Sequence, residues 1–421
     1  MRVPPIFLLL AAASAACSSD ARAPESAAGL TTVFDSTRAD SVIARVVGEV
    51  PPERLRRAVD ELRIAPAADD TTLFAEVTEF DVGLKGELYV FDNPNRVLFI
   101  FDSTGALLRR VGRQGAGPGE FNANNGMVVL RDGRLAQWDA RNGRVSFFSA
   151  AGDFEYSWVV PTGFSTSFGI RTDTSGQLYA YRPVTPPRDG EILGRMGLRR
   201  FGDDGVLMDT LTPPDLPWTR VVYTASVRDN TSSMGPAHGS RFHWQWHPDG
   251  HFVSVATERY AIELSRPERP LRIVRDAPAI PVPDAERQWD QARITFNLRM
   301  TDPSWSFNGP PIPATKPPVA GLHVGRDGRI WVRVSVPSVE IPEAERDTPN
   351  GPTSGPRPPV RTHRDVSTTF EVFSRDGAFL GRVELPANIQ WMEADGDRVW
   401  YIGRDADGLA AVVRARIAPA F

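Results

Sequence analysis

Short runs of apolar and β-forming residues recur along the chain, and each run directly follows a turn that ends in glycine. The runs are ELYVFD, RLAQWD, QLYAY, HFVSV, RIWVRV and DRVWYI, which follow Gly86, Gly133, Gly176, Gly250, Gly328 and Gly396. Runs of this composition between turn residues predict β-strands. A unit that recurs every roughly 40 to 80 residues is typical of a radial array of small sheets.

Two consecutive copies indicate that each repeat contains four strands. Four strand candidates separated by turns follow Phe80, and the same order follows Met127. In both copies the later turn glycine comes nineteen positions after the first, from 86 to 105 and from 133 to 152. We therefore predict an all-β, six-bladed β-propeller that forms a single domain over residues 30–421.

The ends of this propeller need a closing strand. The last copy, over residues 388–417, supplies only three strand candidates. A strand near Thr31 to Phe34 is predicted to provide the fourth and to lock the ring, which removes exposed sheet edges. Residues 51–62, between this strand and the first blade, have apolar residues at helical spacing: Leu55, Ala58, Val59 and Leu62. This spacing predicts a short amphipathic helix.

Two insertions interrupt the blades. Residues 281–318 contain a helical core, DAERQWDQARITFNLRM, followed by a Pro-rich stretch. Residues 337–365 are too rich in Pro, Gly and charge to predict packing. We interpret both as surface excursions, with disorder as the default expectation.

The N-terminus predicts export and a lipid anchor. Residues 1–16 combine Arg2 with an apolar stretch of about a dozen residues, which is too short to span a bilayer and is typical of a signal peptide. The only cysteine, Cys17, follows small residues and resembles the lipidated cysteine of a bacterial lipobox. Residues 17–29 would then be a tether. We expect an outer-membrane lipoprotein facing the periplasm or the cell surface, with ordinary signal cleavage as the alternative.

Residues 87–121 carry a family resemblance. The block resembles the NHL-like six-bladed β-propellers of bacterial lipoproteins, whose blades have Asp-x-x-Asn-x-Arg turns and a Gly-x-Gly-Pro-Gly-Glu-Phe junction. Residues 115–121 match the junction. The turn is matched by Asp139, Asn142 and Arg144, and in a version one residue shorter by Asp92, Asn95 and Arg96. The resemblance implies a fold and no ligand, because members differ widely in what they bind.

The junction and the turns also have alternative interpretations. Three glycines at 115, 117 and 119 could form a phosphate loop, but no helix is predicted to follow them, so we favour an inter-blade turn. The repeated Asp and Arg of the turns favour turn caps or ion pairs over ligand groups.

Composition narrows the possible partners. The 421-residue chain has 35 Gly and 37 Pro, which suits many short strands and turns. Its formal net charge is −4 and no Lys/Arg stripe appears, which argues against nucleic-acid binding. We expect a monomeric propeller that meets the membrane only through the lipid on Cys17.

Metal and cofactor signals are weak. His243, His247 and His251 form a cluster, but His247 and His251 flank a Pro-Asp-Gly turn and are expected to diverge. Residues 405–408 resemble the start of a calcium loop, yet Arg416 stands where a carboxylate ligand is needed. We predict no metal and no cofactor.

Alignment of the six inner strands on their turn glycines selects candidate ligand residues. Period two separates an apolar packing set from a mixed polar set, which would face the axial channel. The predicted set, five or seven positions before each glycine, is Glu79, Asp81, Arg171, His243, Gln245, His323 and Trp391. Gathered at one mouth of the channel, these side chains could form a ligand site. The alternative is that they make inter-blade hydrogen bonds.

These observations favour binding over catalysis. We predict a non-enzymatic binding or interaction propeller anchored in the bacterial cell envelope, with no catalytic residues. Its partner would be a small ligand, a glycan, a peptide or another envelope protein. The alternatives are a metal-assisted lyase or hydrolase with a channel site near His243 and His323, and a structural scaffold in an envelope complex.

Overall fold

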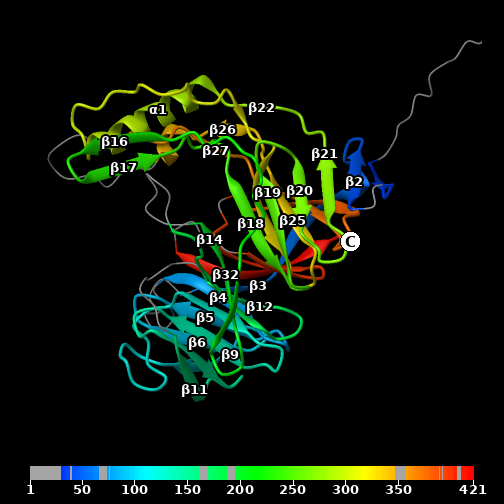
Figure 1. The fold of residues 1–421 in the computed structure, drawn as a ribbon, viewed down its shortest axis with the longest axis vertical. Helices are drawn as coiled ribbons and strands as arrows, with labels where there is room; N and C mark the ends of the chain where they lie inside the picture. Colours follow the sequence, from blue (N-terminus) through cyan, green and yellow to red (C-terminus); the bar gives the residue numbers. More distant parts are fainter. Residues whose placement is uncertain are drawn as a thin grey trace, which may run out of the picture.

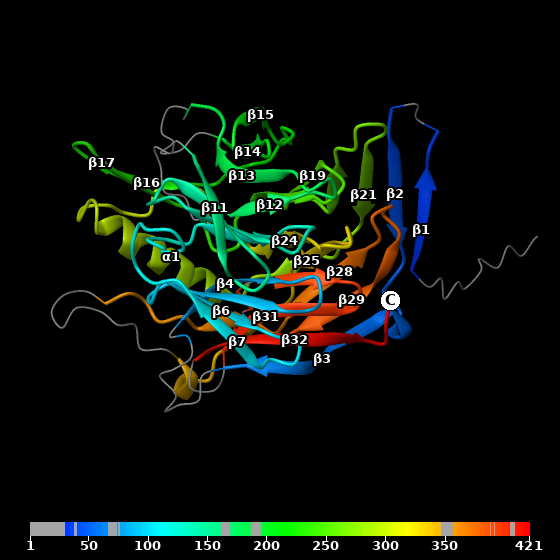
Figure 2. The same ribbon diagram turned by 90° about the horizontal axis from the view of Figure 1, so that it is seen from below.

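In the computed structural model, most strands belong to six small four-stranded units around a common axis (Figures 1 and 2). The structure describes residues 30–37, 40–65, 74, 76–160, 169–186, 195–346, 357–387, 389–390, 392–404 and 409–421. Inner strands of neighbouring units lie side by side, as β4 (Val77–Val82), β8 (Gly126–Val129) and β12 (Ile170–Thr172) do. The predicted all-β, six-bladed β-propeller is therefore confirmed.

The blades follow one another along the chain. Blade one consists of β4 (Val77–Val82), β5 (Leu88–Asp92), β6 (Val97–Phe101) and β7 (Leu107–Val111). Blade two consists of β8 (Gly126–Val129), β9 (Leu135–Asp139), β10 (Arg144–Phe148) and β11 (Phe154–Val159). Blade three consists of β12 (Ile170–Thr172), β13 (Leu178–Pro183), β14 (Met196–Phe201) and β15 (Leu207–Leu211). Blade four consists of β18 (Phe242–His247), β19 (His251–Ala256), β20 (Ala261–Leu264) and β21 (Leu271–Arg275). Blade five consists of β24 (Val319–Val324), β25 (Ile330–Val334), β28 (Thr368–Phe373) and β29 (Phe379–Leu385).

Blade six is completed by a strand from the N-terminal part of the chain, as predicted, but from a different segment. After β30 (Met392–Asp395), β31 (Arg398–Arg404) and β32 (Ala410–Ala418), the fourth strand is β3 (Leu55–Ile64). β3 pairs antiparallel with β32 in a register that runs from Arg57↔Ala418 to Ile64↔Val412. At its start it also pairs parallel with β29, which joins blades five and six.

The helix predicted over residues 51–62 is therefore wrong. Only Pro52–Arg54 forms a single 3-10 turn before β3 begins. Helical spacing of four apolar residues is a local signal, whereas β32 offers a whole row of unpaired backbone groups. Pairing with that row satisfies both strands and removes a sheet edge.

The strand near Thr31 extends blade four instead. β1 (Thr31–Asp35) pairs with β2 (Val42–Val47), which lies parallel to the outer strand β21 in a register that starts at Val42↔Leu271. Ala44 and Val46 are buried in the core shared by blades four and five. The first hairpin is thus an added outer layer of one blade.

The Gly-rich junction is an inter-blade turn, as predicted. Glu120 Oε2 accepts a hydrogen bond from the Gly117 N–H (2.8 Å), and Arg144 donates to the carbonyls of Gly117 (2.6 Å) and Glu120 (2.8 Å). Phe121 is fully buried and makes an edge contact with Phe91, with ring centroids 5.2 Å apart. The Asp-x-x-Asn-x-Arg residues act as turn caps, since Asp139 accepts from the Asn142 N–H (2.9 Å).

Strand alternation gives the propeller two different faces. Turns from first to second strand and from third to fourth are short and lie on one face, which we call the turn face. Connections from second to third strand and from one blade to the next lie on the other face. The long insertions between β15 and β18, between β21 and β24, and between β25 and β28 all belong to that second face.

On that face the insertions fold into a layer that we call the cap, visible at the upper left of Figure 1. It comprises β16 (Tyr223–Val227), β17 (Asn230–Met234), β22 (Ile280–Pro281), α1 (Asp284–Arg299), β23 (Thr315–Lys316), β26 (Ser338–Glu340), the 3-10 turn Glu343–Glu345 and β27 (His363–Asp365). The cap has its own small apolar core of Tyr223, Ala225, Ile294, Leu298, Trp305 and Ile312. The predicted helix is present, but the described parts of both insertions pack and are not disordered excursions.

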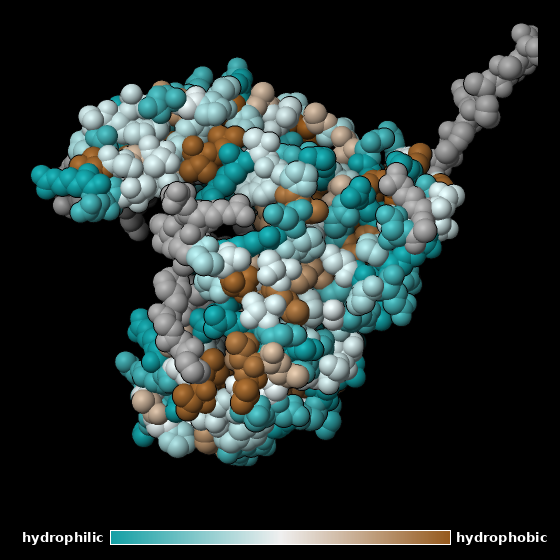
Figure 3. Space-filling view, in the orientation of Figure 1, coloured by the Kyte–Doolittle hydropathy of each residue, from teal (hydrophilic) through white to brown (hydrophobic). Residues whose placement is uncertain are grey.

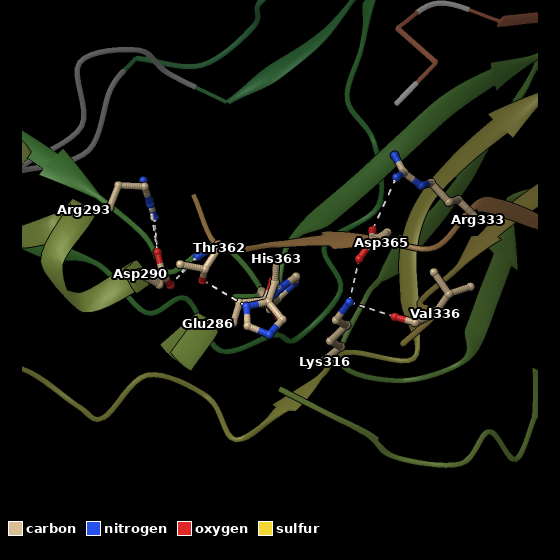
Figure 4. A network of polar contacts seen from close by, with 11 residues as sticks. Glu286, Asp290, Arg293, Lys316, Arg333, Val336, Thr362, His363 and Asp365 are labelled. Atoms are coloured by element: carbon tan, nitrogen blue, oxygen red, sulfur yellow. Dashed lines mark hydrogen bonds and ion pairs between the residues drawn. The ribbon is translucent and has the colours of Figure 1, made fainter. Parts of the chain in front are cut away.

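A polar network ties the cap to blade five (Figure 4). Lys316 Nζ donates to Asp365 (2.6 Å) and to the Val336 carbonyl (2.8 Å), and Arg333 of β25 lies 3.8 Å from Asp365. A buried ammonium needs such partners, because an unpaired buried charge is strongly unfavourable. The residues involved come from both insertions, which explains why neither insertion predicts packing when it is read alone. Among the described residues, no helix is long and apolar enough to cross a membrane.

Candidate functional site

Polar side chains of the inner strands gather at the turn face. A cavity of about 190 Å³ is lined there by Asp81 of β4, Arg171 of β12, Gln245 of β18 and His323 of β24. Four of the seven residues selected from the sequence thus lie together, contributed by four different blades. Blade two contributes the apolar Val128 to the same cavity.

Blade six contributes Glu393, which the sequence alignment missed. In blade one Val82 pairs with Leu88 across a five-residue turn, whereas in blade six Asp395 pairs with Arg398 across only two residues. The shorter turn moves the glycine relative to the strand. Glu393, opposite Trp400, therefore occupies the place that Asp81 has opposite Tyr89. Trp391, which the glycine alignment selected, lies outside the described residues.

Glu79 and Asp81 form inter-blade hydrogen bonds, the alternative that the sequence left open. Glu79 accepts from the Met127 N–H (3.3 Å) and from the Asn124 side chain (2.8 Å), and it does not line the cavity. Asp81 accepts from the Val129 N–H (2.6 Å) but also lines the cavity. Both side chains are buried. The β4 carboxylates therefore pair with backbone groups of β8 that no ladder satisfies.

Arg171 is the central cation of the site. Burial by itself acts to lower the pKa of Arg171, but Tyr181, Glu393, Glu79 and Asp81 more than offset this effect and raise it. In return, burial raises the pKa of both Glu79 and Glu393 to about 7, although Arg171 acts against that rise. Near neutral pH both carboxyl groups are therefore partly protonated, and such shifted pKa values are common in functional sites.

Arg326 is a second cation that the sequence analysis did not select. It lies in the loop after β24, lines the cavity, and its Nη1 is 3.7 Å from Asp81. Its backbone N–H donates to the Ala394 carbonyl of blade six (2.8 Å), so it is held at the boundary of blades five, six and one. A loop position lies outside the period-two pattern of a strand, and this is why the alignment could not detect it.

Two polar atoms in the cavity wall have no hydrogen-bond partner among the described residues. They are His323 Nε2 and the indole Nε1 of Trp246, and both are buried. Burial, followed by the charge of Arg171, lowers the pKa of His323 to about 3, so its imidazole is neutral. Because buried polar atoms usually have a hydrogen-bond partner, a water molecule or ligand in the cavity would supply one to each of these two atoms.

His243 lies elsewhere. It lines a larger cavity of about 920 Å³ between the cap and the start of β18, and of the described residues Gln245 alone lines both cavities. His243 and His323 therefore do not share one site. Within the described ranges, no three His, Cys, Asp or Glu side chains are grouped so that they could hold a metal ion. The calcium-like residues 405–408 lie outside those ranges.

His247 and His251 do not diverge, contrary to the sequence expectation. They are paired across the β18–β19 hairpin, with stacked rings whose centroids are 4.2 Å apart. The register explains the difference, because residues opposite each other on an antiparallel pair point to the same side of the sheet. His247 Nε2 is 3.0 Å from the Gly328 carbonyl, which makes it an inter-blade contact.

Comparison with known proteins supports the fold. Residues 69–184 match the model of a family described as a 6-bladed beta-propeller (DUF5128). Among curated proteins, none matches the sequence.

Several solved structures are similar to the chain at low identity. A putative exported protein from Bacteroides fragilis has 10% identity and a TM-score of 0.44, and the match covers 86% of this chain and 99% of that one. A DUF4221 member from Bacteroides vulgatus has 11% identity and a TM-score of 0.49, with 87% and 100% covered. A virginiamycin B lyase from Staphylococcus aureus has 11% identity and a TM-score of 0.35, with 92% and 94% covered. Similarity at this level carries no inference about activity.

Proposed function

We propose that this propeller is a binding protein that takes a small zwitterionic molecule, such as a free amino acid, into the turn-face cavity. The observation that carries the proposal is the pairing of opposite charges in one cavity. Asp81 and Glu393 offer carboxylates, and Arg171 and Arg326 offer guanidinium groups. A ligand with one ammonium and one carboxylate could satisfy both kinds of group at once.

The size of the cavity supports the same class of ligand. Its volume is about 190 Å³. This is less than the roughly 300 to 1,000 Å³ of sites for drug-sized ligands, so a smaller molecule fits. His323 Nε2 and Trp246 Nε1, both without a partner among the described residues, would add hydrogen bonds that orient the ligand.

Calorimetric titration tests the proposal with glycine, alanine and serine as zwitterionic probes and with ethylamine and acetate as half-molecules. We expect the zwitterions to bind about tenfold or more tighter than either half, because each half leaves one pair of charges unmatched. Glu393→Gln should weaken zwitterion binding about tenfold, since it removes one of the carboxylates that line the cavity. His251→Gln is the control, because His251 is also buried but lines neither cavity. Zwitterions that give no heat and no thermal shift at millimolar concentration would refute the proposal.

Binding should also release a proton. The pKa of Glu393 is about 7, so below this pH the ligand's ammonium must displace a proton from the carboxyl group. Affinity should therefore rise as pH increases and should level off above about pH 8, with a slope of about tenfold per pH unit at low pH. Titration in buffers of different ionisation enthalpy measures the released proton directly. Glu393→Gln should reduce the number of released protons.

We further propose that Cys17 anchors this binding protein in the outer membrane. The support is the sequence alone, because Cys17 lies outside the described residues. Cys17→Ser should move the protein from the membrane fraction to the soluble fraction, because the lipid would be its only membrane attachment. Membrane fractionation with immunodetection measures this change. Unchanged fractionation would exclude the anchor and favour ordinary signal cleavage.

A further inference from the structure

The larger cavity lies beneath the cap, on the face opposite the turn-face cavity. Its volume is about 920 Å³, within the range of sites for drug-sized ligands. Its wall is formed by β17 of the cap, by residues 213–222 of the connection from β15 to β16, by β18 and by the beginning of β14. In Figure 3 the surface is hollowed between the projecting cap and the blades. We call this space the cap cavity.

The cap cavity is cationic. Arg195, Arg220 and Arg241 line it, and among the described residues Asp215 is the one acidic side chain in its wall. Asp215 lies 3.7 Å from Arg195. No carboxylate of the described residues pairs with Arg220 or Arg241, and both arginines are exposed. Two guanidinium groups are therefore available to bind an anion, for which their planar donor geometry is well suited.

The same cavity has aromatic walls. Tyr181 stacks on Trp244 with ring centroids 5.0 Å apart and planes inclined by 18°, and Trp218 and Phe242 line the cavity nearby. These side chains are only partly buried, so part of each ring remains open to a ligand. Rings that are fixed by stacking present a flat apolar surface at low entropic cost.

His243 adds a polar group to this wall. Its Nε2 is buried and has no hydrogen-bond partner among the described residues. Burial, followed by the charges of Arg241 and Arg333, lowers the pKa of His243, so the ring is neutral near pH 7. A neutral imidazole can form a hydrogen bond with a hydroxyl group without repelling the neighbouring arginines.

From this arrangement we infer a second binding site, which goes beyond the zwitterion site: the cap cavity binds an anionic ligand that carries a ring. The ring lies against Trp244 and Trp218, and the carboxylate or other acidic group pairs with Arg220 and Arg241. Acidic saccharides and aromatic carboxylates share this chemistry. The two cavities differ in charge among the described residues: Asp81, Asp173 and Glu393 line the turn-face cavity, whereas Asp215 is the one carboxylate that lines the cap cavity.

Calorimetric titration of the intact protein tests the site with two matched pairs of probes. Digalacturonate is compared with neutral maltose, and naphthoate with neutral naphthalene methanol. We expect one of the acidic probes to bind at least about tenfold tighter than its neutral partner, with a preference that weakens as salt increases. The acidic probe that binds identifies whether the ligand class is a saccharide or an aromatic acid.

Variants then assign the binding to the cap cavity. The double variant Arg220→Gln, Arg241→Gln should lose the preference for the acidic probe. Arg398→Gln is the control, because Arg398 is an exposed arginine of β31 in blade six. Glu393→Gln, in the other cavity, should leave the preference unchanged, so that failure of one site is distinguishable from failure of the other. The inference is overturned if no acidic probe binds at millimolar concentration, if neutral probes bind equally well, or if the double variant keeps the preference.

Discussion

Removing β3 should abolish cooperative folding of the propeller. A chain that starts after Ala65 lacks the strand that pairs with β32 from Arg57↔Ala418 to Ile64↔Val412. Ala411, Val413, Ala415 and Ile417 of β32 are fully buried in the native protein. Without β3 the ring is open, and β32 becomes an exposed apolar edge that favours aggregation. We expect loss of a single thermal transition in circular dichroism and aggregates in size-exclusion chromatography.

A shorter truncation provides the control for this experiment. A chain that starts after Gly48 lacks β1 and β2 but keeps β3. Because β2 lies outside the four strands of blade four but buries Ala44 and Val46, this variant should stay monomeric and lose about 5 to 10 °C in melting temperature. Addition of a peptide with residues 49–65 should restore the transition of the longer truncation. Equal behaviour of the two truncations would show that β3 does not close the ring.

Replacing Arg171 with methionine should destabilise the protein in a pH-dependent way. Glu79 and Glu393 have a pKa of about 7 in the folded protein, above the ordinary value of 4.5. The stability associated with their protonated forms is therefore fully present below pH 4.5 and is lost as pH rises through 7. Without the Arg171 guanidinium the pKa values of both glutamates rise further. The loss of folding stability at alkaline pH therefore becomes larger. We expect a cost of about 3 to 5 kcal/mol near pH 8 and clearly less near pH 5.

Denaturant unfolding near pH 5 and pH 8 measures this difference. Arg182→Met is the matched control, because Arg182 is a buried arginine that lies over the Trp138 ring, 4.4 Å from its centroid. Neither Glu79 nor Glu393 contributes to the shift of its pKa, so its loss should not depend on the protonation of these two groups. An equal cost of Arg171→Met at both pH values would contradict the charge network. Rescue of Arg171→Met by Glu393→Gln near pH 8 would support it.

Only part of the candidate site was predictable from the sequence. Turn geometry explains which of its residues were predicted and which were not. Asp81, Arg171, Gln245 and His323 were found because their blades share one turn length, so that the distance to the turn glycine reports the same position on each inner strand. Glu393 was missed because its hairpin turn has only two residues. Arg326 was missed because loop residues follow no period. The number of residues before the turn glycine identifies equivalent strand positions only in blades whose turns have the same length.

By itself, the sequence determined the repeating unit: short strands, their order within a blade, the Gly-rich junction and the helix of the cap. These features depend on local conformational preferences, such as the turn glycines and the alternation of apolar residues. Only the tertiary structure decided that Leu55–Ile64 is a strand, that the two insertions pack into one cap, and that Glu393 joins the charges around Arg171. Each of these outcomes depends on partners far away in the chain. Hydrogen bonds and ion pairs with such partners outweigh the local conformational preference of a segment.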